Sequence, residues 1–170
     1  FTLSIWLKTD DVSSRQHVFQ QTGSNDNRVI AINSGGSLTS RLGGNGSDQL
    51  SGVTLSTDTW YHIVLVHDNS ANTLKWYVNG TEQNTNTSVN VPSNTGTFYL
   101  GTNSDADDKF FNGQIDEVRI WDDVRTAAEI ADNKDDELVG NESGLVAYYK
   151  MSDGTGTTLT DNSSNSNNGT

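Results

Sequence analysis

One acidic loop in the sequence carries side chains that could bind a divalent cation. Oxygen-bearing side chains stand at alternate positions in it, at Asn103, Asp105 and Asp107, with Asp108 beside them. This spacing lets a turning chain wrap one ion, and such hard oxygen ligands are those that Ca²⁺ prefers. The loop is not an EF-hand, because Asp108 replaces the glycine of the sharp turn and Gln114 replaces the bidentate glutamate. We therefore expect either a calcium site or a solvated acidic loop between two strands.

Glycoside hydrolysis would need different chemistry, namely two carboxyl groups that face one substrate about 5 Å apart in a retaining enzyme. On a strand such a pair requires acids two or four positions apart, and no expected strand carries one. Asp116 and Glu117 are adjacent, so strand alternation predicts that they point to opposite faces. His62 and His67 are also expected on opposite sides of their strand, and we interpret them, with His17, as structural residues. The sequence thus indicates a protein that is not an enzyme.

Sugar binding would need aromatic faces next to polar donors and acceptors, and the chain offers four Trp and five Tyr. On a β scaffold the loops at the sheet edges usually carry function. The candidate ligand contacts are therefore the residues of one polar loop, Asn25, Asp26, Asn27 and Arg28.

Short runs of alternating apolar and polar residues must position these groups. The runs that predict strands are 1–8, 17–21, 28–32, 37–42, 59–67, 73–78, 98–101, 113–121 and 145–151. Asn79-Gly80 is a strong signal for a type I′ hairpin turn. One short helix is expected near 126–132, where Thr126 and Glu129 can form a capping box. Many short strands with a single helix predict an all-β, two-sheet antiparallel sandwich of the jelly-roll type.

Length and composition limit the class of protein further. The 170 residues suffice for a core, so we expect a single domain over residues 1–170, cut from a larger protein because it opens on Phe1. The absence of Cys excludes disulfides, thiolate zinc sites and cysteine catalysis. A formal net charge of −12 disfavours nucleic acid and anionic membranes as partners. No run approaches the roughly 20 apolar residues of a membrane span.

Two blocks of the sequence resemble one known superfamily. Residues 59–66 read TWYHIVLV and residues 74–80 read LKWYVNG, which is similar to the paired strand and hairpin pattern of laminin-G-like and pentraxin-like domains. Residues 111–121 read FNGQIDEVRIW and resemble the closing strand of the same domains. The resemblance implies the concanavalin A-like jelly roll, and it implies that Trp60 and Trp76 belong to the core.

The same resemblance implies a second calcium site. In glucanase relatives, an aspartate near the start of the closing strand helps to hold a structural calcium, and Asp116 stands at the matching position. The partners would be Asp153 and backbone carbonyls near Ser152 to Gly154. Alternatively, Asp116 faces solvent or pairs with an arginine. A buried carboxylate without any such partner would cost several kcal/mol.

One departure from the family pattern concerns the order of segments. Residues 144–170 resemble the segment that usually opens such a domain, but here they stand last. Either the unit is permuted or the chain is a window cut from tandem repeats. In the second case a strand from outside the window is missing, and an edge is left exposed to pairing.

Together these patterns predict a non-catalytic, calcium-stabilised, carbohydrate-binding module of a secreted or cell-surface protein such as an adhesin. We expect Ca²⁺ as the cofactor, a glycan or polysaccharide as the partner, neighbouring domains, and neither nucleic acid nor membrane insertion. The alternative is a structural or protein-binding spacer that recognises a peptide or a neighbouring repeat through an exposed sheet edge. A glycoside hydrolase is the least favoured reading.

Overall fold

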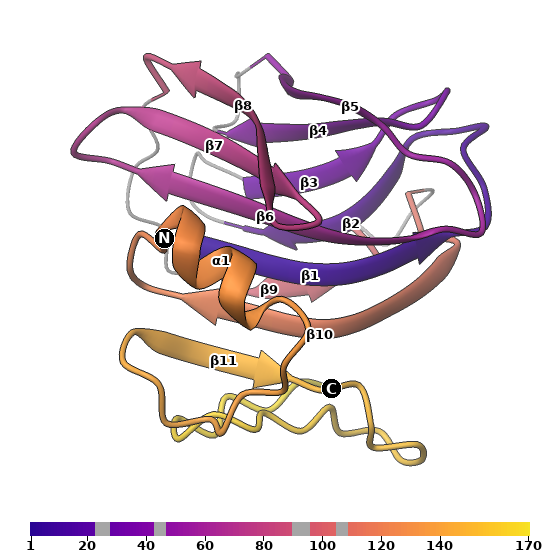
Figure 1. The fold of residues 1–170 in the computed structure, drawn as a ribbon. Helices are drawn as coiled ribbons and strands as arrows, with labels where there is room; N and C mark the ends of the chain where they lie inside the picture. Colours follow the sequence, from indigo (N-terminus) through magenta and orange to yellow (C-terminus); the bar gives the residue numbers. More distant parts are fainter. Residues whose placement is uncertain (23–27, 43–46, 90–95, 105–108) are drawn as a thin grey trace.

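Two antiparallel sheets pack face to face and form a β-sandwich with one short helix (Figure 1). The computed structural model describes the chain except residues 23–27, 43–46, 90–95 and 105–108. The six-stranded sheet has the order β11-β10-β1-β6-β7-β8, and the five-stranded sheet has the order β5-β4-β3-β2-β9. The expected all-β, two-sheet antiparallel architecture is confirmed.

The element bounds follow the hydrophobic alternation closely. The strands are β1 (Thr2–Thr9), β2 (Gln16–Gln21), β3 (Arg28–Ile32), β4 (Ser37–Leu42), β5 (Gln49–Thr54), β6 (Trp60–Asp68), β7 (Thr73–Val78), β8 (Thr81–Thr87), β9 (Phe98–Leu100), β10 (Gly113–Trp121) and β11 (Leu145–Tyr149). Every strand expected from the sequence is present. β5 and β8 were not expected, because their side chains are largely polar on both faces.

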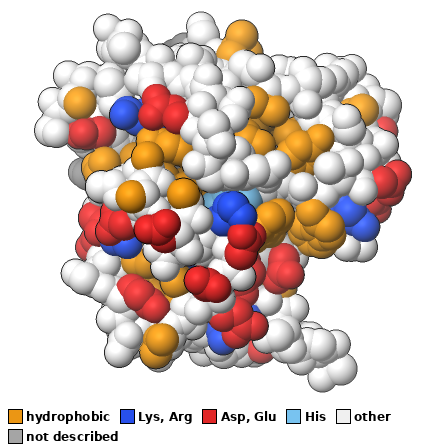
Figure 2. All heavy atoms as spheres, in the orientation of Figure 1, with side chains coloured by type: hydrophobic (Ala, Val, Ile, Leu, Met, Phe, Trp, Pro, Cys, Tyr) orange, Lys and Arg blue, Asp and Glu red, His pale blue; other side chains and the backbone are white. Residues whose placement is uncertain are grey.

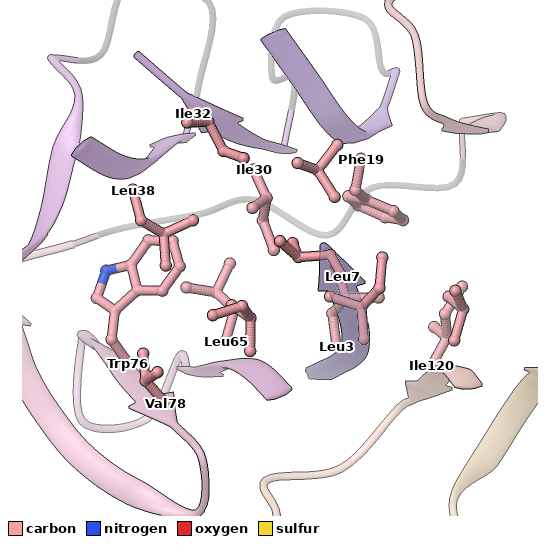
Figure 3. Packing of buried hydrophobic residues seen from close by; sticks show 14 of the residues in the cluster. Leu3, Leu7, Phe19, Ile30, Ile32, Leu38, Leu65, Trp76, Val78 and Ile120 are labelled. Carbon is pink, nitrogen blue, oxygen red and sulfur yellow. The ribbon is translucent and has the colours of Figure 1, made fainter. Parts of the chain in front are cut away.

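The core lies between the two sheets (Figure 3). Leu3, Ile5 and Leu7 of β1 are fully buried in it, as strict alternation predicts. Trp76 is fully buried as well, which confirms the expectation for this tryptophan. The alternate side chains of β1, including Trp6 and Lys8, therefore lie on the outer face of the six-stranded sheet.

The helix α1 (Ala127–Asn133) packs on that outer face (Figure 1). Its capping box is present as expected: the Thr126 hydroxyl accepts from the Glu129 amide, and the Glu129 carboxylate accepts from the Thr126 amide. Ile130 anchors the helix against Val64, Val66 and Tyr77. The cap thus sets where the helix begins, and one apolar contact fixes it to the sheet.

The hairpin between β7 and β8 turns at Asn79-Gly80, with φ values of 51° and 81°. Positive φ at both positions is what a type I′ turn requires, so this expectation is confirmed. The Asn79 side chain also accepts a hydrogen bond from the His62 amide at 2.9 Å. The turn is therefore tied to the neighbouring strand β6.

The last part of the chain forms β11 and then a loop-rich segment, residues 150–170, at one end of the molecule (Figure 1). We call this segment the tail. β11 pairs antiparallel with β10 and is the edge strand of the six-stranded sheet. The tail is held by the Asp161 carboxylate, which accepts from the amides of Tyr148, Ser163 and Asn167. One buried carboxylate thus fastens the tail to β11.

Candidate functional site

A hollow of about 310 Å³ lies on the outer face of the six-stranded sheet, beside the end of α1. We call it the tryptophan hollow; it is lined by Trp6, Trp60, Asp116, Glu117, Arg119 and residues 134–137. Figure 2 shows acidic side chains gathered on this face of the molecule, around α1 and β10. Aromatic rings and carboxylates therefore meet in one concave site.

Two tryptophans from neighbouring strands form the apolar part of this hollow. Trp60, at the start of β6, is 38% exposed, so the expectation that it belongs to the core is wrong. Trp60 pairs with Lys8 of β1, so its side chain lies on the outer face of the six-stranded sheet and not between the sheets. Trp6 is partly buried, and its indole N–H donates to the carbonyl of Lys134 at 2.9 Å. Trp6 is thereby fixed, whereas the ring of Trp60 stays accessible.

A β-bulge in β10 brings two adjacent acids to the same hollow. Ser4 pairs with Arg119 and Trp6 pairs with Asp116, so β10 has one residue more than β1 between these pairs. Glu117 is the extra residue, with a left-handed φ of 49°. The prediction that Asp116 and Glu117 point to opposite faces is therefore wrong, because both line the hollow.

The sequence contained a signal for this bulge. Ile115, Val118 and Ile120 all pack with the core, yet the first two are separated by two residues rather than one. A strand that keeps strict alternation cannot place residues three apart on one face, so one extra residue must lie between them. The spacing of these apolar residues could have located the paired acids.

A hydrogen-bonded network fixes the floor of the hollow. Arg119 is 3% exposed, and it donates to the Glu117 carboxylate and to the carbonyl of Asn133, each at 2.7 Å. It also donates to the carbonyl of Asp136. The Tyr148 hydroxyl donates to the same oxygen of Glu117 at 2.7 Å. The Glu117 carboxylate thus accepts hydrogen bonds from both Arg119 and Tyr148, which hold it in place in the lining of the hollow.

The tryptophan hollow is electronegative. Five acids and two cations line it, and both cations have partners: Arg119 pairs with Glu117, and Lys134 pairs with Asp135. Asp116 forms no ion pair within the described residues. Burial raises the pKa of Asp116, and the charges of Glu117 and Glu137 raise it further. An unpaired carboxylate therefore lies beside the two tryptophans.

The predicted calcium ligands fall into two groups. Asp116 is in the hollow, whereas both carboxylate oxygens of Asp153 accept from Thr160, at 2.5 and 2.9 Å. In the part of the chain that the structure describes, no three His, Asp or Glu side chains come together as a metal site. Asn103 is described and buried. The other predicted loop ligands, Asp105, Asp107 and Asp108, lie outside the described residues. The calcium site at Asp116 and the calcium site in the loop therefore both stay predictions.

The predicted ligand-contact loop is only partly described. Asn25, Asp26 and Asn27 lie outside the described residues. Arg28 is the first residue of β3 and 6% exposed, so its assignment to an exposed loop is wrong. Its guanidinium bonds to the Gln21 side chain and lies 4.7 Å from the centre of the Phe1 ring. Arg28 is a strand residue that packs inside the sandwich.

The three histidines are buried. His62 and Trp6 have ring centroids 5.3 Å apart, and a nitrogen of the His62 ring lies 2.8 Å from the Ser4 hydroxyl. Burial lowers the pKa of His62 and of His67 to about 4, so both are neutral at pH 7. His17 is also buried, and burial lowers its pKa. These environments agree with structural roles.

A family described as the concanavalin A-like lectin/glucanases superfamily matches residues 1–131. The chain belongs to this superfamily. None of the curated proteins matches the sequence. The superfamily sandwich is the one that the two sheets form, and the two sequence blocks that suggested it lie in β6, β7 and β10.

Solved structures share the fold. A candidate carbohydrate-binding protein of Bacteroides ovatus is 22% identical, with a TM-score of 0.76 over 94% of this chain and 48% of that chain. Domain 4 of the extracellular arabinanase AbnA of Geobacillus stearothermophilus, in complex with arabinotriose, is 25% identical, with a TM-score of 0.63 over 78% of this chain and 65% of that one. The CBM40 domain of a Ruminococcus gnavus sialidase, bound to sialyllactose, is 17% identical, with a TM-score of 0.64 over 78% and 81%. The chain thus spans about half the length of the Bacteroides protein.

We also looked among the described residues for a helix that could span a membrane. No helix among them has the length and apolar character that crossing a bilayer demands.

Proposed function

We propose that the chain is a non-catalytic carbohydrate-binding module of a secreted or cell-surface protein, such as an adhesin, and that the tryptophan hollow is its glycan site. The observation that carries the proposal is the exposed ring of Trp60 beside the unpaired carboxylate of Asp116 in one concave site. Two of the structural neighbours are complexes with saccharides, which supports this class of ligand.

The chemistry of the hollow suits a sugar. An aromatic face offers apolar contact to the C–H face of a pyranose or furanose ring, while a few polar groups fix its orientation. Trp60 supplies the accessible face, and Asp116 supplies acceptors for sugar hydroxyls. Trp6 and Arg119 are held by hydrogen bonds to the last residue of α1 and to the segment after it, so the site is formed before a ligand arrives.

The arrangement of the two acids favours binding over hydrolysis. A glycosidase needs one carboxyl group that donates a proton and a second that acts as nucleophile or base. The Glu117 carboxylate accepts from Arg119 and from Tyr148, so it is held in place within the wall of the hollow. Of these two adjacent acids, Asp116 is the one that forms no ion pair among the described residues. We therefore propose a module that binds a saccharide without cleaving it.

The proposal also includes a calcium site that is separate from the glycan site. We propose that Asn103, Asp105, Asp107 and Asp108 hold one Ca²⁺ ion that stabilises their loop, because their oxygen side chains have a spacing suited to one ion. Saccharide binding in the tryptophan hollow does not depend on this ion. A chelator should therefore change stability and leave the affinity for sugar in place.

A glycan array followed by calorimetric titration tests the function. The array should give defined saccharide hits, and the best soluble hit should lose at least about tenfold in affinity in Trp60→Ala, the scale expected when an aromatic anchor is truncated. Phe110→Ala is the matched control, because Phe110 is another exposed aromatic ring, 55% accessible, outside the hollow. The control variant should bind like the parent chain.

Three other outcomes of these experiments would contradict the proposed site or the proposed function. Loss of binding in Phe110→Ala with normal binding in Trp60→Ala would move the site to the loop beside Phe110. Silence on the whole array would favour the alternative function, a structural or protein-binding spacer. Release of reducing sugar from an array hit, lost in Asp116→Asn, would show a hydrolase.

A further inference from the structure

We propose a second binding surface on this chain, independent of the glycan site: the open side of the sandwich receives an extended polypeptide strand from another protein. The strand would be uncharged, with apolar side chains at alternate positions, and would add to β9 as a sixth strand of the smaller sheet. Three features of the structure carry this inference: the unequal size of the sheets, a groove lined by uncharged side chains, and the edge of β9 that pairs with no strand among the described residues.

The two sheets differ by one strand, and the difference lies at one end. β5 contacts β8, so these edge strands face each other at one side of the sandwich. Counting from that side, β4 faces β7, β3 faces β6, β2 faces β1, and β9 faces β10. β11 is then the strand of the larger sheet that has no counterpart. The place opposite β11 is where a sixth strand would complete the smaller sheet.

A groove of about 710 Å³ occupies this place. We call it the strand groove; it is lined by residues 97–100 and 102, Ile120, residues 146, 147 and 149, Leu159 and residues 167–170. It is therefore walled by β9, by β10 and β11, and by the tail. None of the side chains that line it carries a charge. Several of them, including Phe98, Leu100 and Leu159, are partly buried and pack against the main core. Among the described residues, no strand covers this part of the core.

The edge of β9 supplies hydrogen-bonding groups to the strand groove. β9 pairs with β2 on one side, and in the described part of the chain no strand lies along its other side. The Thr22 amide donates to the Thr97 carbonyl at 3.0 Å, and the Gly101 amide donates to the Val18 carbonyl at 2.9 Å. In an antiparallel ladder such bonded pairs alternate with non-bonded ones. Tyr99, two residues from each end of this series, therefore forms a bonded pair with β2.

It follows that Phe98 and Leu100 lie at non-bonded positions toward β2. Their backbone N–H and C=O groups point away from β2, toward the free edge of β9. The two N–H donors and two C=O acceptors of these residues are aligned along an apolar groove. Such an arrangement is a template for the addition of a further strand. A small apolar ligand would fill the groove but leave these groups without partners, whereas an extended peptide satisfies both requirements.

Selection from a library of random peptides tests the proposal, because it works for a partner whose sequence is unknown. The full chain of 170 residues is the bait. The enriched peptides should lack charged residues and should carry apolar side chains at alternate positions. Synthetic versions of the best peptide are then N-methylated at one backbone position at a time. Methylation at alternate positions should weaken binding at least about tenfold, and methylation between them should have little effect, because alternate amides of a strand face the template.

Hydrogen exchange and one variant locate the peptide. In the free chain the Tyr99 amide should exchange slowly, and the amides of Phe98 and Leu100 should exchange fast and slow down at least about tenfold with bound peptide. Val146→Lys places a charge on the groove wall and should abolish peptide binding, while Val124→Lys, at an exposed valine outside the groove, should not.

Three results would overturn the proposal: no enrichment of alternating uncharged peptides, N-methylation effects without alternation, or Phe98 and Leu100 amides already protected in the free chain. The exchange and N-methylation readouts remain decisive if Val146→Lys fails to fold. Because the glycan test uses Trp60, failure of either proposal leaves the other standing.

Discussion

Asp116 and Glu117 are consecutive residues of β10, and their side chains nevertheless line the same hollow. The bulge at Glu117 produces this relationship. The two acids then serve different purposes: Glu117 is bonded to Arg119 and Tyr148, while Asp116 stays without an ion pair among the described residues. One of the two adjacent carboxylates is thus held in the wall of the hollow, and the other lines the hollow without an ion pair among the described residues.

Saccharide binding should depend on pH through Asp116. Burial, together with nearby Glu117 and Glu137, raises the pKa of Asp116, so this group loses its negative charge at a higher pH than an ordinary aspartate, whose pKa is about 3.9. As pH falls through that raised pKa, a good acceptor for sugar hydroxyls is lost, and affinity should fall. Titration calorimetry between pH 7 and pH 4 measures this. Asp116→Asn should bind more weakly at pH 7 and show a flat profile, whereas Asp132→Asn, on the exposed face of α1, should keep the parent profile.

The charge of the hollow should select against acidic sugars. Five acids line it, and both of its cations are already paired with acids. A sialylated glycan should therefore bind several-fold more weakly than the same glycan without sialic acid, and added salt should reduce the difference. Matched pairs on a glycan array at low and high salt provide the measurement. Stronger binding of the sialylated member would mean that the hollow is not the site.

Acid should destabilise the sandwich through His62. Burial lowers its pKa to about 4, against about 6.5 in the unfolded chain, so the unfolded state binds more protons in this range. The stability that neutral His62 provides is complete above pH 6.5, declines as pH falls from 6.5 to 4, and is lost below 4. Between pH 7 and pH 4.5 the loss should be about 2 kcal/mol. Urea unfolding at both values should show a smaller loss in His62→Gln; an equal loss in both chains would contradict the buried neutral state.

The Asp161 carboxylate should be the most important contact that holds the tail against β11. Burial alone would raise its pKa, but hydrogen bonds from Tyr148, Ser163 and Asn167 lower it below the ordinary value. Asp161→Asn replaces an acceptor by a donor and should cost about 2–4 kcal/mol near neutral pH, since several charge-assisted bonds are lost. Because the pKa is depressed, the difference from the parent chain should shrink as pH falls below 4. Chemical unfolding measures the change.

The matched control lies in the same tail. Asp153→Asn removes an exposed carboxylate that also bonds to a neighbour, Thr160, and it should change stability much less. Equal effects of the two substitutions would show that burial of Asp161 is unimportant.

Calcium should raise the melting temperature if the loop with Asp105, Asp107 and Asp108 binds it. At 100 times the dissociation constant the gain is about 2.7 kcal/mol, and a chelator should reverse it. Asp107→Asn should reduce the response, while Asp132→Asn, at an exposed position of α1 that belongs to neither predicted calcium site, should retain it. An unchanged melting curve in millimolar calcium would remove the ion from the proposal.

Much of the fold could be predicted from hydrophobic alternation. The expected bounds of β3, β4, β7 and β10 are confirmed, as are the capped helix and the Asn79-Gly80 turn. β5 and β8 could not be found in this way, because the pairing of edge strands depends on backbone bonds to their neighbours and not on an apolar face.

The candidate site was harder to predict than the fold. Trp60 begins a strand that is apolar on both faces, and its ring is exposed because it lies on the outer face of the sheet, opposite Lys8 of β1. The contact between Trp6 and the carbonyl of Lys134 joins residues far apart in sequence, and local patterns carry no information about such pairs. Strand alternation also fails where a bulge inserts one residue, as it does at Glu117.

The strand β10 contributes side chains to both proposed binding surfaces, one on each of its faces. Its outward side chains, Asp116 and Arg119, line the tryptophan hollow, while its inward Ile120 lines the strand groove, and the two linings share no residue. Occupants of the two surfaces would therefore not compete for space. A tethered sugar polymer and a protein strand could be bridged by a single 18.4 kDa unit, so that each captured partner raises the effective concentration of the other.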